Sequence, residues 1–399
     1  MKQFTVPNIY RSSLISGIKQ ERRQQDKLKK DFTPTLLDLG PLQIYLARHF
    51  GFCYGVENAI EIAFNTIEDN PDKRIFLLSE MIHNPQVNAD LEALGVRFLQ
   101  DTYGKQLIPF DELTANDVVI IPAFGTTLEI EKILTAKGIV ITRYNTTCPF
   151  VEKVWNRSEQ IAQKGYSIVV HGKPRHEETR ATFSHASSHT PTVVVNDMAE
   201  TIELAKYITG EKKAEQFETE FAGRYSPGFN VAEHLGRIGV VNQTTQLATD
   251  TQAISDYLKK VIVEHYTLDA ATVSERFADT RDTLCYATND NQTAVLGMLE
   301  MPADLAIVIG GHNSSNSSHL VELCEAKLPT YFIDSAKRLL SKTEIEDRNW
   351  RTKELTIKKN YLRGHAPLRI LMTSGASCPD AVVESVIRKL GDFFGVKEI

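Results

Sequence analysis

One alternation recurs through most of the chain and limits the folds open to it. A short apolar or β-branched run leads into a polar or glycine-bearing turn and then an amphipathic stretch, as in "RIGVVNQTTQLATD" and "LAIVIGGHNSSNSSHL". Each such unit predicts a strand, a loop and a helix, and units in series predict parallel sheets with right-handed crossovers. We therefore expect an α/β protein from Leu42 onward, with its polar turns beyond the carboxyl ends of the strands, where ligands bind in such sheets.

The polar turns fall into three groups of three, and each group opens with a cysteine. The cysteines are Cys53, Cys148 and Cys285. The second turns follow after 30, 28 and 29 residues, at His83, His176 and Ser314, and the third turns follow after 71, 96 and 92 residues, at Phe124, Thr244 and Ser377. This weak repetition predicts a trefoil of three small α/β domains around a pseudo-threefold axis. We place them at residues 42–146, 147–280 and 281–399, after an N-terminal extension at 1–41.

Composition and charge exclude several classes of protein. The chain has 399 residues, of which 42% are hydrophobic and 24% charged, and its net charge is −6. That charge offers no field for nucleic acid, and no apolar run approaches the roughly 18 to 20 residues that a membrane span needs. We expect a soluble cytoplasmic protein, or one of the plastid stroma if the source is a plant or alga. The charged stretch 17–32 predicts a solvated helix or a disordered arm and resembles no targeting signal.

Five widely spaced cysteines are typical of a reducing compartment. If the three cysteines that open the groups converge, their thiolates would suit an iron-sulfur cluster that leaves one iron open as a Lewis acid. A structural zinc site is less favoured, because such sites usually draw on close pairs such as C-x-x-C and none occurs. The alternative is that each cysteine is a small buried hydrophobic residue. Cys324 lies at helical spacing with Leu320 and Leu323, so we interpret it as a helix-packing residue. For Cys378 the sequence does not decide between a ligand and a buried residue.

The turn "HNSSNSS", residues 312–318, has the composition of a flexible linker but lies between an apolar run and an amphipathic segment. It contains no lysine or arginine. At the start of a helix its hydroxyls, amide and backbone N–H groups would favour an anion. We therefore interpret it as an anion-binding turn.

Several motifs together resemble one enzyme family. In chain order they include "GFCYGVENAIEIA", "EMIHNPQV", "NTTCPFVEKV", "RHEET", "NQTT", "LCYATNDNQTAV", "HNSSNSSHL" and "SGASCPD". They resemble the 4-hydroxy-3-methylbut-2-enyl diphosphate reductases, and in particular the longer cyanobacterial and plastid-type branch, from about Leu42 to Val396. The resemblance implies a reductase that removes the allylic hydroxyl to give isopentenyl and dimethylallyl diphosphates, the last step of the methylerythritol phosphate route to isoprenoids.

The same resemblance implies a cofactor and an electron source. One 4Fe-4S cluster per subunit would be held by Cys53, Cys148 and Cys285, with one open iron. Ferredoxin or flavodoxin would supply the electrons one at a time.

The resemblance also implies which residues meet the substrate. The diphosphate would contact His83, His176, Ser314, Ser315, Asn316 and Ser377. Glu178 and Thr244 would serve the proton path to the substrate hydroxyl. Adjacent helical side chains point about 100° apart, so we expect Glu177 to face solvent. Phe124 departs from the family, because many bacterial members carry a histidine in that turn.

Two other functions fit the same features. One is an iron-sulfur hydro-lyase acting on a phosphorylated substrate, which would remove water without net reduction. The other is a non-catalytic protein that binds a phosphate ligand and keeps its cysteines for structure.

Overall fold

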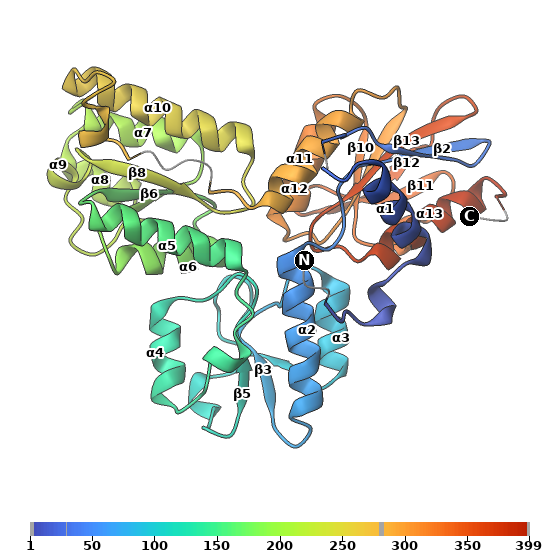
Figure 1. Cartoon of the computed structure of the whole chain (residues 1–399), viewed down its shortest axis with the longest axis horizontal. Coiled ribbons are helices and arrows are strands. Elements are labelled where there is room, and N and C mark those ends of the chain that lie inside the picture. Colours follow the sequence, from blue (N-terminus) through green and yellow to red (C-terminus); the bar gives the residue numbers. More distant parts are fainter. Residues whose placement is uncertain (1–3, 29, 279–282, 397–399) are drawn as a thin grey trace. The chain divides into compact units, whose positions relative to one another are not determined.

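The computed structural model describes residues 4–28, 30–278 and 283–396 (Figure 1). These residues divide into two compact units. Unit 1 comprises Met1–Glu61, Ile82–Ala93 and Tyr286–Ile399, and unit 2 comprises Ile62–Met81 and Leu94–Cys285. None of the helices in the described part of the chain is long and apolar enough to cross a membrane.

Unit 1 is built on a five-stranded sheet with the order β1-β2-β13-β9-β10. The strands are β1 (Thr35–Asp38), β2 (Leu42–Leu46), β13 (Leu368–Ser374), β9 (Leu305–Ile309) and β10 (Thr330–Ile333). Neighbouring strands are parallel except β1, which pairs antiparallel with β2. Every residue of β9 is buried, as expected for a parallel strand covered on both faces.

Helices and one hairpin complete unit 1. The helices are α1 (Ser13–Gln25), the first half of α2 (Tyr54–Asp69), α3 (Pro85–Ala93), α11 (Tyr286–Met298), α12 (Ser315–Glu325) and α13 (Asp380–Phe393). The hairpin pairs β11 (Glu344–Arg348) with β12 (Leu355–Lys359). One apolar core joins the sheet to α1, α11, α12 and α13.

Unit 2 contains two three-stranded parallel sheets, with the orders β4-β3-β5 and β7-β6-β8. The first has β3 (Ile75–Leu77), β4 (Arg97–Phe98) and β5 (Val118–Ile120); the second has β6 (Ser167–His171), β7 (Thr192–Val195) and β8 (Ile238–Asn242). The helices are α4 (Leu128–Ala136), α5 (Pro149–Gln163), α6 (Glu177–Ser187), α7 (Met198–Ile208), α8 (Ala214–Glu220), α9 (Val231–His234) and α10 (Ala248–Tyr266). The prediction of an α/β protein with several parallel sheets is confirmed.

The segment that leads to each cysteine lies beside the last strand of the preceding group. The parallel pairs are β2 with β13, Asn145 with Ile121, and Phe277 with Ile238. β2, which lies within the predicted domain at 42–146, thus pairs with a strand of the C-terminal group, and the predicted division stays a prediction. The predicted boundary at 280/281 lies outside the described residues, and the three-domain trefoil stays a prediction.

The N-terminal segment is more closely packed than its charge suggested. The Ser12 hydroxyl caps α1 by accepting the Ile15 N–H at 2.9 Å, and the Ile15 side chain is fully buried in the core of unit 1. The Lys19 ammonium bonds Asp380 Oδ1 at 2.7 Å. The predicted helix within 17–32 is therefore present, but it is docked and is neither disordered nor solvated on all sides. Residue 29 lies outside the described residues.

Two helical glycines provide a matched test of this packing. A Cβ on Gly297, in α11, would lie 2.5 Å from the Phe32 carbonyl oxygen, whereas a Cβ on Gly17, in α1, would meet nothing within 4 Å. We expect Gly297→Ala to destabilise the protein by about 1–3 kcal/mol through overpacking. Gly17→Ala should stabilise it by about 0.5–1 kcal/mol through helix propensity. Thermal unfolding of both variants measures the two signs, and a stabilising Gly297→Ala would contradict the packing of Phe32 on α11.

Candidate active site

The three cysteines that open the groups occupy the same local position. Cys53 and Cys285 directly precede the first residues of α2 and α11, and Cys148 is the N-cap of α5. All three are half-buried, and none forms a disulfide with another described residue. The N–H groups and dipole of a helix N-terminus attract negative charge and can stabilise a thiolate, but burial outweighs them at Cys53 and raises the pKa of its thiol. The predicted equivalence of the three turns therefore holds at the level of local structure.

Each cysteine turn is fastened to a third turn by a backbone hydrogen bond. The Cys N–H donates to the carbonyl of a residue that lies just beyond the end of β5, β8 or β13. The bonds are Cys148 to Ala123 at 2.9 Å, Cys285 to Thr244 at 3.2 Å, and Cys53 to Ala376 at 3.1 Å. The cysteine of each group is thus tied to the third turn of the preceding group, and the first cysteine is tied to the third turn of the last group.

The three cysteines are divided between the two units. Cys53 lies in unit 1, and Cys148 and Cys285 lie in unit 2. Within either unit as described, no group of three or more His, Cys, Asp and Glu side chains forms a metal site. The convergence of the three thiolates stays a prediction.

Unit 1 brings together three of the residues predicted to bind diphosphate. The Ser377 hydroxyl donates to the His83 carbonyl at 3.2 Å, and Asn316 Oδ1 accepts the Ala376 N–H at 3.0 Å. Gly311 approaches the His83 carbonyl so closely that a Cβ would lie 2.0 Å from its oxygen. His83, Asn316 and Ser377, from three distant parts of the sequence, therefore line one buried junction.

The N-terminus of α12 carries polar side-chain atoms for which the described part of the chain offers no hydrogen-bond partner. The Ser314 hydroxyl is the cap and accepts the Ser317 N–H at 3.1 Å. Ser315 Oγ and Asn316 Nδ2 are buried and have no hydrogen-bond partner among the described residues. Leaving a buried donor unsatisfied costs about 1–3 kcal/mol, so such atoms call for an explanation. At a helix N-terminus, an anionic ligand supplies one.

Unit 2 holds the residues predicted for proton transfer. His176 is the N-cap of α6, and its Nδ1 accepts the Glu178 N–H at 3.2 Å. The Glu178 side chain is 2% exposed. Thr244 contacts both carboxylate oxygens: its N–H donates to Oε1 at 2.5 Å and its hydroxyl to Oε2 at 3.0 Å. The predicted pair of Glu178 and Thr244 is therefore in direct contact.

The expectation that Glu177 faces solvent is wrong. Its side chain is only 6% exposed and accepts a hydrogen bond from the Ser79 hydroxyl. The physical reason is that the first turn of α6 is enclosed by protein on more than one side, since α6 packs against α4, α5 and the adjacent sheet. Glu177 and Glu178 therefore point in different directions from α6, but both side chains are buried.

The turn that contains Phe124 is held by aromatic contacts. The Phe124 ring meets the His176 ring edge to face, with centroids 5.7 Å apart. Gly125 has φ +75°, and a Cβ there would lie 2.5 Å from the Trp155 ring. His185 stacks on Trp155 at 3.7 Å and contacts the Thr126 carbonyl at 3.3 Å through Nε2. Burial lowers the pKa of His185, so a neutral ring that donates Nε2–H fits this contact.

The two remaining cysteines belong to the core of unit 1. Cys324 and Cys378 are both buried among apolar side chains. Burial raises the pKa of each thiol to about 12, because desolvation penalises the thiolate. The interpretation of Cys324 as helix packing is confirmed, and Cys378, which precedes α13, is buried in the same apolar core.

One positioning residue escaped the sequence interpretation. Gln243 is fully buried, and its Oε1 accepts from the Thr179 hydroxyl at 3.0 Å and the Lys173 N–H at 3.2 Å. These bonds tie the turn before α6 to the turn that carries Thr244. The signal that could have identified it is its place, one residue past a buried strand and directly before Thr244.

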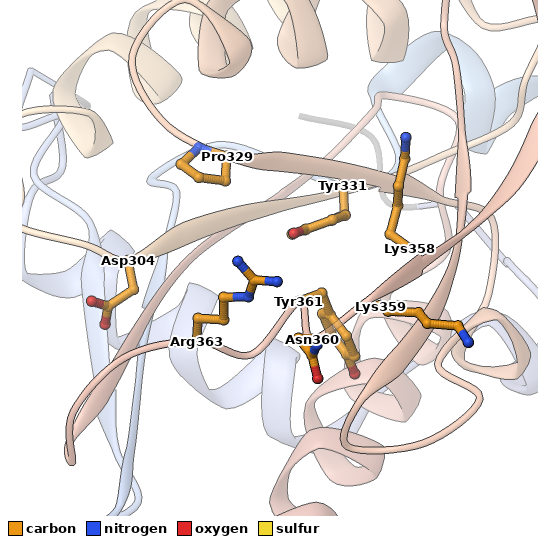
Figure 2. A pocket seen from close by; sticks show the side chains of 8 residues that line it. All are labelled: Asp304, Pro329, Tyr331, Lys358, Lys359, Asn360, Tyr361 and Arg363. Atoms are coloured by element: carbon orange, nitrogen blue, oxygen red, sulfur yellow. The ribbon is translucent and has the colours of Figure 1, made fainter.

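A pocket of about 270 Å³ lies elsewhere in unit 1 (Figure 2). Its lining includes Tyr331, Tyr361 and Arg363, and also Asp304 and Pro329, which directly precede β9 and β10. The pocket is therefore at the amino ends of these strands, whereas the turns of Gly311 and Ser377 follow the carboxyl ends. It contains none of the predicted site residues.

Comparisons with known proteins agree on one family. The family model described as LytB protein matches residues 44–391. The 4-hydroxy-3-methylbut-2-enyl diphosphate reductase of Cyanothece sp. is 37% identical over 383 residues, which cover 96% of this chain and 89% of that relative. The reductase of Gloeobacter violaceus is 36% identical over 397 residues, covering 96% and 92%. Both relatives are cyanobacterial, in agreement with the predicted branch.

Solved structures point the same way. One of them, described as the reductase that is the terminal enzyme of the non-mevalonate pathway, is 26% identical with a TM-score of 0.51 and covers 88% of this chain and 99% of that chain. The reductase from Plasmodium falciparum, at 21% identity and a TM-score of 0.62, covers 88% of each chain and supports the fold alone. The family match, the full-length relatives and the fold together show that the chain belongs to the LytB family, the 4-hydroxy-3-methylbut-2-enyl diphosphate reductases.

Proposed function

We propose that this chain catalyses the reductive dehydroxylation of 4-hydroxy-3-methylbut-2-enyl diphosphate to isopentenyl and dimethylallyl diphosphates. In this reaction the allylic C–O bond breaks, two electrons and two protons are consumed, and the oxygen leaves as water. The observation that carries the proposal is a pair of buried donors at the start of α12, Ser315 Oγ and Asn316 Nδ2, which have no hydrogen-bond partner among the described residues, in a chain of this family. A hydro-lyase or a phosphate-binding protein is less favoured, because the relatives across the whole chain are reductases.

The diphosphate would be bound without lysine or arginine. Ser315 and Asn316 would donate from the start of α12, together with the backbone N–H groups and dipole of that helix. His83, His176, Ser314 and Ser377 would complete the contacts. Neutral donors suit a buried site, because they add no charge that must be desolvated when the substrate is absent.

The thiolate set fits an iron-sulfur group. Cys53, Cys148 and Cys285 are half-buried and form no disulfide among the described residues, and each lies at a helix N-terminus, whose N–H groups can stabilise a thiolate ligand. At Cys53 burial opposes this effect and raises the pKa of the thiol. We propose that they hold one 4Fe-4S cluster per subunit. When bound, it would supply electrons and a Lewis-acidic iron that polarises the leaving hydroxyl. Ferredoxin or flavodoxin is the proposed donor, and the cytoplasm or plastid stroma the proposed location.

Glu178 and Thr244 would deliver the proton that the leaving hydroxyl needs. A hydroxyl leaves poorly as hydroxide, and a positioned acid removes that penalty. The contact between the Thr244 hydroxyl and Glu178 Oε2 at 3.0 Å offers a short path between carboxyl and substrate. His176 supports this path by accepting the Glu178 N–H, which fixes the first turn of α6.

The first functional prediction concerns the cluster. Changing Cys53, Cys148 or Cys285 to serine should abolish or severely damage the visible absorption of the anaerobically reconstituted protein, because each thiolate is a ligand. Cys324→Ala is the matched control and should keep the absorption, because that thiol lies in the core of unit 1. Intact absorption after Cys148→Ser would contradict the model.

The second prediction concerns the proton donor. Glu178→Gln keeps an oxygen to accept the Thr244 N–H but cannot donate an acidic proton. We expect kcat to fall by about 10² or more, while KM and the cluster absorption change little. Glu177→Gln is the matched control, because Glu177 is the buried neighbour of Glu178 and a glutamine there can still accept the hydrogen bond from Ser79. This variant should retain most of the wild-type kcat. A larger loss in Glu177→Gln than in Glu178→Gln would mean that the roles are reversed.

The third prediction concerns the diphosphate. Asn316→Asp keeps the oxygen that accepts the Ala376 N–H but replaces the Nδ2 donor by a second acceptor. We expect KM for the diphosphate substrate to rise by about tenfold or more, with the cluster absorption unchanged. Ser318→Ala is the control, since the Ser318 hydroxyl donates to the Ser314 carbonyl of its own helix at 3.0 Å. Equal KM values in Asn316→Asp and wild type would remove Asn316 from the substrate site.

A further inference from the structure

The N-terminal segment Phe4–Lys19, here called the N-terminal strap, covers the turn that carries Cys53. The Phe4 ring meets the Tyr54 ring edge to face with centroids 4.8 Å apart, and the Tyr10 ring meets Phe52 in the same way at 5.9 Å. Phe52 and Tyr54 are the two neighbours of Cys53 in the chain. Phe4 and Tyr10 are both buried, although they lie near the start of the chain. The strap therefore packs on both sides of one proposed cluster ligand.

The far end of the strap contacts the same turn from a third direction. The Lys19 ammonium lies 4.6 Å from the centroid of the Phe50 ring and bonds Asp380 Oδ1 at 2.7 Å. Gly51, at φ +81°, fits beneath this ion pair, since a Cβ there would lie 2.4 Å from Asp380 Oδ1 and 2.9 Å from Lys19 Nζ. The four residues that flank Cys53 in this turn thus contact the strap or the ion pair that it forms: Phe50, Gly51, Phe52 and Tyr54.

The strap is also anchored beyond this turn. The Tyr10 hydroxyl donates to Asp90 Oδ2 at 2.7 Å, on α3, the helix that follows His83. The Thr5 N–H donates to Glu61 Oε1 at 2.7 Å, on α2. Arg11 bonds the Val6 and Phe4 carbonyls at 3.1 and 3.2 Å, which closes the strap on itself. These bonds give the strap a defined path.

We propose that the N-terminal strap is a positioning and shielding element for Cys53: it holds the turn in the geometry of a cluster ligand and keeps solvent-borne reagents away from the sulfur. The contacts that carry this role are made by Phe4 and Tyr10, and the anchor is the bond from Tyr10 to Asp90. The identity of the iron group rests on the proposed function. The cover over Cys53 does not, because all of its contacts lie within unit 1.

Thiol reactivity tests the cover without the cluster. The cluster-free, reduced full-length protein is treated with iodoacetamide at fixed pH, and mass spectrometry of its peptides follows the alkylation of Cys53 and Cys148 separately. Phe4→Ala removes one aromatic contact and should raise the alkylation rate of Cys53 by about tenfold. Tyr10→Phe removes only the bond to Asp90 and should raise it in the same direction. Cys148, which belongs to unit 2, is the internal reference, and its alkylation rate should not change.

Ile9→Ala is the matched control within the strap, because Ile9 is 64% exposed and should leave the Cys53 rate at the wild-type value. A second measurement follows the loss of cluster absorption in air for the reconstituted proteins, which should be faster in Phe4→Ala and Tyr10→Phe than in Ile9→Ala. Equal Cys53 rates in all four proteins would overturn the proposal, as would a parallel rise of Cys53 and Cys148, which indicates general loosening. A protein that fails to bind a cluster would count against the proposed function, while the alkylation rates would still decide the role of the strap.

Discussion

A backbone hydrogen bond from each cysteine N–H to a carbonyl just beyond a strand end is the contact on which the arrangement of the site depends. It occurs three times, at Cys53, Cys148 and Cys285, with lengths of 2.9–3.2 Å. A cysteine at a helix start has an N–H that the helix cannot satisfy internally, so the bond fulfils an obligatory requirement of the backbone. It also fixes the position of the cysteine backbone from which each thiol side chain extends. The same contact therefore serves both folding and the placement of the thiols.

Some of the buried polar side chains around these turns have hydrogen-bond partners, and others have none among the described residues. The second kind indicates where a ligand would bind. Glu178 is enclosed but receives two hydrogen bonds from Thr244, so its burial is compensated within unit 2. Gln243 is likewise fully buried and bonded. Ser315 Oγ and Asn316 Nδ2 are buried without partners among the described residues, at the start of a helix. The oxygens of a bound diphosphate would accept hydrogen bonds from these donors. Binding would thereby remove the free-energy cost of leaving them buried without partners.

The packed N-terminal segment changes how the first forty residues should be understood. Their charge suggested solvent exposure, yet Tyr10 and Ile15 are buried and β1 extends the main sheet. A few apolar and aromatic residues suffice for docking, because burying one large side chain contributes about 1.5–3 kcal/mol. The remaining charges of α1 lie on its outer surface or pair across it, as Lys19 does with Asp380. The segment is therefore an integral part of unit 1.

The sequence by itself determined the α/β class, the parallel strands and the turns that carry polar residues, because apolar runs and helical periodicity are local properties. It also identified the three equivalent cysteines and the contact partners Glu178 and Thr244, through repetition and family resemblance. Only the tertiary structure decided that β2 joins β13, that Glu177 is buried, that Gln243 holds two turns together and that Phe4 and Tyr10 pack beside Cys53. These contacts join segments that lie far apart in the sequence. The residue pattern of one segment predicts its own secondary structure but does not identify the distant segment that packs against it.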